Sequence, residues 1–166
     1  MLIDISYFTS GPRSIQNASM SKNPKPDSQV VNSTIEKYVA DLQPGFLRKM
    51  VGEDEAVHIE DYLQISDDVS DKDSRYGIVC DMLREQFADY VFFHILRYAN
   101  DQVTATGTVR LKCANEYLSP LSLQVKTWNR MVEGNRRFVD RCMKGECPVD
   151  VSVDRNMLEK INAFDL

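Results

Sequence analysis

The side chains that could perform catalysis or bind a metal are few in this sequence. Histidine, the residue used most often for acid–base catalysis and metal binding, occurs only as His58 and His94. No serine or cysteine dyad, phosphate-binding glycine loop or alternating set of calcium ligands is present. We therefore predict that the protein is not an enzyme and that it binds neither a metal nor a cofactor. The cysteines, none in a CxxC pair, are Cys80, Cys113, Cys142 and Cys147.

Cys142 and Cys147 leave an alternative open. They flank the predicted end of a helix, so they could meet, or bind zinc together with ligands elsewhere. The interpretation that we favour is reduced, partly buried thiols in a cytosolic protein. His94 lies among aromatic residues, which favours a core histidine bonded to a backbone or tyrosine group over a catalytic one.

The net charge of −5 is unevenly distributed along the chain. Acidic residues dominate positions 51–73, where Lys72 is the single basic residue, and basic residues outnumber acidic ones over positions 119–147. A bipolar surface of this kind suits head-to-tail stacking of identical copies, and two solvated helix faces are the alternative. The sequence pI near 5.1 and the lack of interleaved aromatic residues argue against dedicated nucleic-acid binding.

The elements that position these residues are mostly helical. Apolar residues recur at helical spacing over residues 74–99 and 119–143, which predicts two long helices. A shorter helix begins near Ser33, and the Pro44–Gly45 pair predicts a break at about Gln43 before one more turn that ends at Gly52. The core predicted on the two long helices consists of Val79, Leu83, Phe87, Tyr90, Val91, Val125, Trp128, Val132 and Val139.

Two other segments show strand-like alternation without a nearby partner. Residues 1–31 alternate weakly before glycine, proline and serine interrupt them, and residues 101–116 alternate valine or alanine with threonine around Gly107. A lone two-stranded ribbon is marginal in water. The ribbon therefore pairs with a neighbouring copy, or it packs on a tail strand of its own chain at residues 149–153.

The predicted fold class is thus mainly α, a small helical bundle with an extended N-terminal arm and a β-ribbon or hairpin inserted between the two long helices. The arm is predicted at residues 1–31, the helical core at 32–147 with its ribbon insertion at 101–116, and a tail with a short strand and a helix at 148–166. The total of 166 residues is the length of one domain.

No apolar run approaches the roughly 18 residues that a membrane span needs. The first residues, Met1 to Asp4, lack the basic region and the long apolar stretch of a signal peptide. We therefore expect a protein that is made and used in the cytoplasm, or in a particle assembled there.

The order of several local phrases is similar to that of a known family. They are "YFTSGPRSIQN", "IEKYVADLQPGFLRKMVG", an aromatic helix that runs into "HILRYANDQVTATGTVR", and "LSLQVKTWNRMVEGNRRF". Together they resemble the small head-to-tail connector or ring (adaptor) proteins of tailed bacteriophages, especially those of the crAss-like group. The resemblance covers about residues 1–145 and includes no catalytic signature.

The resemblance implies a structural virion protein located in the neck of the particle. Roughly twelve copies would form a ring that docks below the portal protein, contacts the adjoining connector or tail rings, and extends the channel through which DNA passes without sequence-specific binding. The residues expected to contact neighbouring subunits or partners are Tyr7, Phe8, Arg13, Thr104, Thr106, Val109 and Arg110. The alternative is a small cytoplasmic helical binding or regulatory protein, with a nucleic-acid or protein partner and without catalysis.

Overall fold

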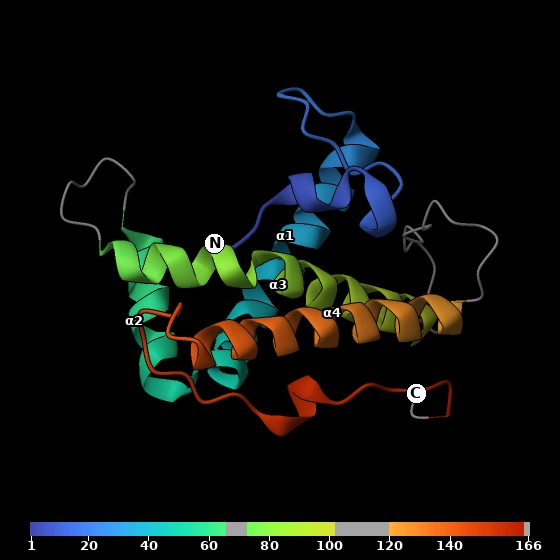
Figure 1. The fold of residues 1–166 in the computed structure, drawn as a ribbon. Helices are drawn as coiled ribbons and strands as arrows, with labels where there is room; N and C mark the ends of the chain where they lie inside the picture. The colour runs from blue at the N-terminus through green and yellow to red at the C-terminus, as the bar shows by residue number, and fades with distance from the viewer. Residues whose placement is uncertain (66–72, 102–119, 165–166) are drawn as a thin grey trace.

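The protein is mainly α, as predicted. The computed structural model describes residues 1–65, 73–101 and 120–164, and within them it contains four α-helices and no strand. The α-helices are α1 (Pro26–Val51), α2 (Glu53–Gln64), α3 (Ser74–Asp101) and α4 (Pro120–Met143) (Figure 1). Three short 3₁₀ helices are η1 (Ile5–Phe8), η2 (Gly11–Arg13) and η3 (Arg155–Leu158).

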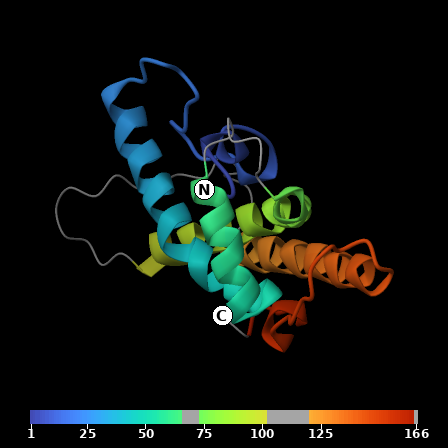
Figure 2. The same cartoon turned by 90° about the vertical axis from the view of Figure 1, so that its left-hand side faces the viewer.

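The two long helices that the sequence predicted, α3 and α4, form an antiparallel pair at the centre of the molecule (Figure 1). Helix α1 crosses this pair, and the N-terminal half of α1 projects beyond it (Figure 2). Phe46 of α1 packs against Phe87 and Tyr90 of α3, with ring centroids 5.0 and 5.3 Å apart. The aromatic contacts between α1 and α3 therefore anchor the crossing.

Most of the predicted core residues of α3 and α4 are buried, and three lie at the edge of the core. Val79, Leu83, Phe87, Tyr90, Val91 and Val132 are buried. Val125, Trp128 and Val139 are half-buried. The buried face of α4 instead includes Leu123, Thr127, Met131, Asn135 and Phe138. Among these residues, Asn135 is buried with its side-chain amide donating to the Met157 carbonyl at 2.8 Å, so a polar residue shares the buried face with apolar ones.

Helix α1 begins earlier than the sequence predicted, and it is not broken at Gln43. It begins at Pro26, where the fixed φ of proline suits the first helical position, rather than at Ser33. It also continues through Pro44, which removes one backbone hydrogen bond at a cost of about 3 kcal/mol. The residues after Pro44 offset this cost, because Phe46, Leu47, Met50 and Val51 are buried. The helix ends at Gly52, as predicted.

The N-terminal residues are not an extended arm. Leu2, Ile3, Phe8 and Ile15 are buried in the main core. The Leu2 amide donates a hydrogen bond to the Gln43 side chain at 2.6 Å, which fixes the start of the chain to α1. Burial of apolar side chains away from water is favourable, and here the helices provide the apolar surface. The segment therefore packs on its own chain. The predicted boundary between an arm and the helical core, at residue 31, lies inside α1.

The C-terminal segment contains no strand among its described residues. The region predicted as a strand, residues 149–153, runs beside the end of α1, where the Ser152 amide donates to the Val51 carbonyl at 3.3 Å and the Asp154 amide donates to the Lys49 carbonyl at 2.7 Å. Asp154 caps the following helix, which is the single 3₁₀ turn η3 and not a longer helix. The carbonyl groups at the C-terminal end of α1 thus accept the backbone hydrogen bonds that a partner strand would have accepted.

The predicted β-ribbon at 101–116 lies outside the described residues, apart from Asp101, which is the last residue of α3. Four of the predicted contact residues, Thr104, Thr106, Val109 and Arg110, therefore remain predictions. Within the described ranges, no helix is both long enough and apolar enough to cross a membrane.

Candidate functional site

The structure places the predicted contact residues of the N-terminus within the protein's own packing. Phe8 is fully buried, and Tyr7 packs against the edge of the core. Arg13 reaches across to α3 and forms ion pairs with Glu85 and Asp89. Phe8 and Arg13 therefore have intramolecular roles in the single chain, and contacts of Tyr7, Phe8 and Arg13 with neighbouring subunits stay predictions.

A buried ionic cluster around Asp89 joins three separate parts of the chain. The Asp89 carboxylate accepts hydrogen bonds from Arg13 of η2 at 2.9 Å and from Arg130 of α4 at 2.8 and 2.5 Å. Its side chain is only 5% exposed. A carboxylate buried to this extent requires such partners. The sequence carried one signal of this cluster, a single acidic residue inside the strongly apolar stretch "FADYVFF".

The electrostatics of Arg13 follow from this arrangement. Burial alone would lower the pKa of Arg13, but hydrogen bonding to Glu85 and the charge of Asp89 outweigh burial and raise the pKa above its ordinary value. The guanidinium therefore stays charged. Its role is to hold the N-terminal segment against α3.

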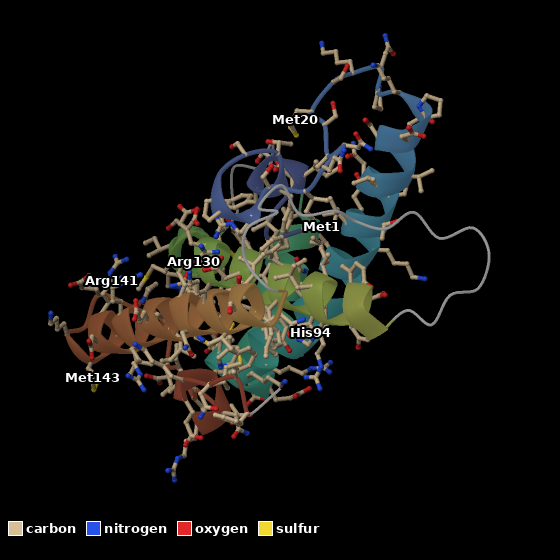
Figure 3. All side chains as sticks on the ribbon, turned by 90° about the vertical axis from the view of Figure 1, so that its right-hand side faces the viewer. Met1, Met20, His94, Arg130, Arg141 and Met143 are labelled. Carbon is tan, nitrogen blue, oxygen red and sulfur yellow. The ribbon has the colours of Figure 1, made fainter. Side chains whose placement is uncertain are left out.

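His94 lies in an aromatic environment near the end of α3 that is opposite to Arg141 and Met143 (Figure 3). The rings of Tyr90, Phe93 and Tyr98 surround it at centroid distances of 4.5, 5.5 and 6.2 Å. Neither ring nitrogen has a hydrogen-bond partner in the described part of the chain, whereas the sequence favoured a bonded histidine. Burial, followed by the charges of Lys49 and Arg97, lowers the pKa of His94 to about 4.

An open groove of about 890 Å³ follows the N-terminal half of α1. Its apolar part includes Tyr38 and Tyr98, whose rings stack at a centroid distance of 5.8 Å. Val30 and Tyr98 remain 52% and 49% exposed. The residues that line the groove are Gln29, Val30, Ser33, Thr34, Lys37, Tyr38, Asp41, Leu42 and Tyr98. The groove combines exposed apolar side chains with a polar rim, the composition of a protein–protein contact surface.

The basic residues of α4 are largely engaged within the protein. Arg130 pairs with Asp89, Arg136 donates two hydrogen bonds to the Leu158 carbonyl, and Arg141 pairs with Glu146. Guanidinium groups committed in this way are poorly placed to contact phosphate. These three arginines therefore join α4 to α3, to η3 and to the turn that follows α4.

The described part of the acidic segment and the basic C-terminal end of α4 do not form opposite poles. The acidic helix α2 packs near the N-terminal end of α3, where the Tyr62 hydroxyl lies beside Gly77. Because α3 and α4 are antiparallel, the basic C-terminal end of α4 lies at this same end of the pair (Figure 1). Glu53, Asp54 and Glu55 occupy the first turn of α2, where negative charge stabilises a helix. The described part of the acidic segment thus has a local structural explanation.

The structure brings Cys142 and Cys147 together, whereas Cys80 is buried in the core. Among the described residues, no group of three or more histidine, cysteine or acidic side chains is arranged to hold a metal ion. Of the alternatives for Cys142 and Cys147, the described structure therefore supports a pair of neighbouring thiols.

Comparisons with protein-family models, with curated proteins and with solved structures found no match for this chain.

Proposed function

We propose that this protein is a structural, non-catalytic subunit of a homo-oligomeric ring in the head-to-tail connector of a tailed bacteriophage. The local phrases over residues 1–145 imply this role, and the helical core is compatible with the wall of a ring. The single observation that carries the proposal is the exposed apolar groove on α1. In this role the ring lies below the portal, and DNA passes through its channel.

The groove fits a neighbouring copy of the same chain. Subunits of a ring associate head to tail, so each copy needs one surface that receives a different surface of its neighbour. Val30, Leu42 and Tyr98 supply apolar contact area, while Lys37 and Asp41 at the rim can fix the orientation of the neighbour. A partly exposed tyrosine such as Tyr98 suits an interface, because its ring buries a large area and its hydroxyl remains able to bond.

The segment predicted to form the ribbon begins close to this groove. Tyr98 lines the groove, and the predicted ribbon starts at Asp101, three residues later in the sequence. We infer that both surfaces belong to the same subunit interface, with Thr104, Thr106, Val109 and Arg110 as the contacts that the ribbon contributes.

Oligomeric state tests this function. The mass of the wild-type protein is measured by analytical ultracentrifugation over a range of concentrations, and particles at high concentration are viewed by negative-stain electron microscopy. We expect ring-shaped oligomers whose formation needs at least tenfold more protein in the Val30→Arg variant, because the new charge lies in the groove. Val57→Arg is the matched control, since Val57 is 47% exposed on α2, outside the groove.

A wild-type protein that stays monomeric at all concentrations would contradict the proposal, as would equal effects of the two variants. The regulatory alternative predicts a different result. A nucleic-acid-binding protein retains a labelled DNA duplex at moderate salt and releases it steeply as salt rises. We expect no such retention, because Arg130, Arg136 and Arg141 of α4 are engaged within the protein.

A further inference from the structure

The end of α4 reverses the chain so that Cys142 and Cys147 face each other. Gly145 adopts a φ of +79°, and its amide donates to the Cys142 carbonyl at 2.9 Å. The Glu146 amide donates to the Arg141 carbonyl at 3.0 Å, which completes a Schellman motif. The Arg141 and Glu146 side chains also form an ion pair at 2.7 Å across the same turn. This turn brings the two cysteines together, and both of them line one cavity.

The thiol pair borders an accessible cavity. Cys142 and Cys147 are both half-buried, and both line a cavity of about 550 Å³ between the end of α4 and the C-terminal segment. The other walls of this cavity are partly apolar and include Val149 and Val151. A small molecule can therefore reach sulfur atoms that the backbone already holds in proximity.

We propose that Cys142 and Cys147 form a dithiol modification site that closes into an intramolecular disulfide by exchange with a small-molecule disulfide such as glutathione disulfide. This inference does not depend on the proposed function, because it rests on the turn after α4 and not on the groove of α1.

The exchange proceeds in two balanced steps. In the first, the Cys147 thiolate attacks one sulfur of glutathione disulfide, so that a mixed disulfide forms on Cys147 and one glutathione leaves as its thiolate. In the second, the Cys142 sulfur loses its proton and attacks the Cys147 sulfur, which breaks the mixed disulfide and releases the second glutathione. The protein dithiol loses two electrons and glutathione disulfide gains them, and the two glutathione thiolates take up the protons that the protein releases.

The surroundings of the two thiols explain why Cys147 reacts first. Burial, followed by hydrogen bonding to Cys147 and by its charge, raises the pKa of Cys142 to about 12, so Cys142 stays protonated in the resting protein. Once Cys147 carries glutathione, the turn holds the mixed disulfide beside the Cys142 sulfur. The second step is therefore intramolecular and proceeds although the pKa of Cys142 is raised.

Peptide mapping tests the proposal directly. The folded protein is treated with glutathione disulfide, the remaining thiols are alkylated with N-ethylmaleimide, and the protein is digested with trypsin. Cleavage after Lys144 separates the two cysteines into "CMK" and "GECPVDVSVDR". We expect mass spectrometry to detect these peptides linked by a disulfide, and we expect dithiothreitol to separate them again.

The single serine variants distinguish a paired site from two independent thiols, and circular dichroism checks that each variant keeps its helix content. In Cys142→Ser we expect a glutathione adduct to accumulate on Cys147, because the resolving thiol is absent. In Cys147→Ser we expect Cys142 to react at least about tenfold more slowly than Cys147 does. Equal reactivity of the two variants, or a wild-type protein that yields only mixed disulfides or no modified peptide, would overturn the proposal.

Discussion

At the scale of single residues, Asp89 connects the most distant parts of the sequence. Its carboxylate holds Arg13 from the N-terminal segment and Arg130 from α4 on the surface of α3. Removing the charge leaves the largely buried Arg13 guanidinium with only the exposed Glu85 as counter-ion, which costs more than losing an exposed pair. The integrity of the three-way contact therefore depends on one carboxylate.

We expect Asp89→Asn to lower the free energy of unfolding by about 2 to 4 kcal/mol, measured by urea denaturation. Glu85→Gln is the matched control, because it removes a second carboxylate from Arg13 that is 69% exposed in its side chain, and it should cost less than about 1 kcal/mol. Similar losses in both variants would show that the Asp89 pair is no stronger than a surface pair.

His94 makes the stability of the fold depend on pH. The pKa of His94 is about 4 in the folded protein, against an ordinary value of 6.5. Between these two values the unfolded chain binds a proton that the folded protein does not. The stability contributed by neutral His94 is therefore complete above pH 6.5 and is lost as the pH falls toward 4.

We expect the unfolding free energy of His94→Leu to fall less than that of the wild type between pH 7 and pH 4.5, by about 2 kcal/mol. Urea denaturation at the two pH values gives this difference, with His58→Gln, a substitution of an exposed histidine on α2, as the control. Parallel pH dependence in His94→Leu and wild type would mean that His94 is protonated as easily in the folded state as in the unfolded chain.

At the scale of elements, the contact between α3 and α4 requires a glycine. Gly134 lies inside α4, where a glycine can serve either close helix packing or a kink. A Cβ atom at Gly134 would lie 2.6 Å from the Cγ atom of Gln86 on α3. Close helix packing is therefore the reason for the glycine.

We expect Gly134→Ala to destabilise the protein by about 1 to 3 kcal/mol, because the clash with buried Gln86 exceeds the gain in helix propensity. The double variant Gly134→Ala with Gln86→Ala should recover most of the loss that Gly134→Ala causes in the wild-type background. Thermal denaturation of the four proteins in this cycle measures the coupling. Additive effects would place the two residues out of contact.

At the scale of the whole molecule, the N-terminal segment belongs to the core. If residues 1–31 formed an arm, deletion of residues 1–27 would leave the core folded and would abolish only assembly. The structure instead buries Leu2, Ile3, Phe8 and Ile15 against the helices. Each such side chain contributes about 1.5 to 3 kcal/mol when fully buried, and a domain is stable by only about 5 to 15 kcal/mol.

We therefore expect deletion of residues 1–15 to abolish cooperative thermal unfolding, as followed by circular dichroism. Phe8→Ala should lower the melting temperature much more than Tyr7→Ala, because Phe8 is fully buried and Tyr7 lies at the edge of the core. A truncated protein that melts as cooperatively as the full chain would restore the interpretation of this segment as an arm.

The sequence alone determined the mainly α class, the two long helices, the end of α1 at Gly52 and the glycine that follows α4. These features depend on local periodicity and on the conformational freedom of glycine, which a single segment displays. Only the tertiary structure decided the continuation of α1 through Pro44, the packing of the N-terminal segment, the Asp89 cluster and the groove on α1. Each of these depends on residues far apart in the chain, so the free energy that selects it arises only when the helices meet.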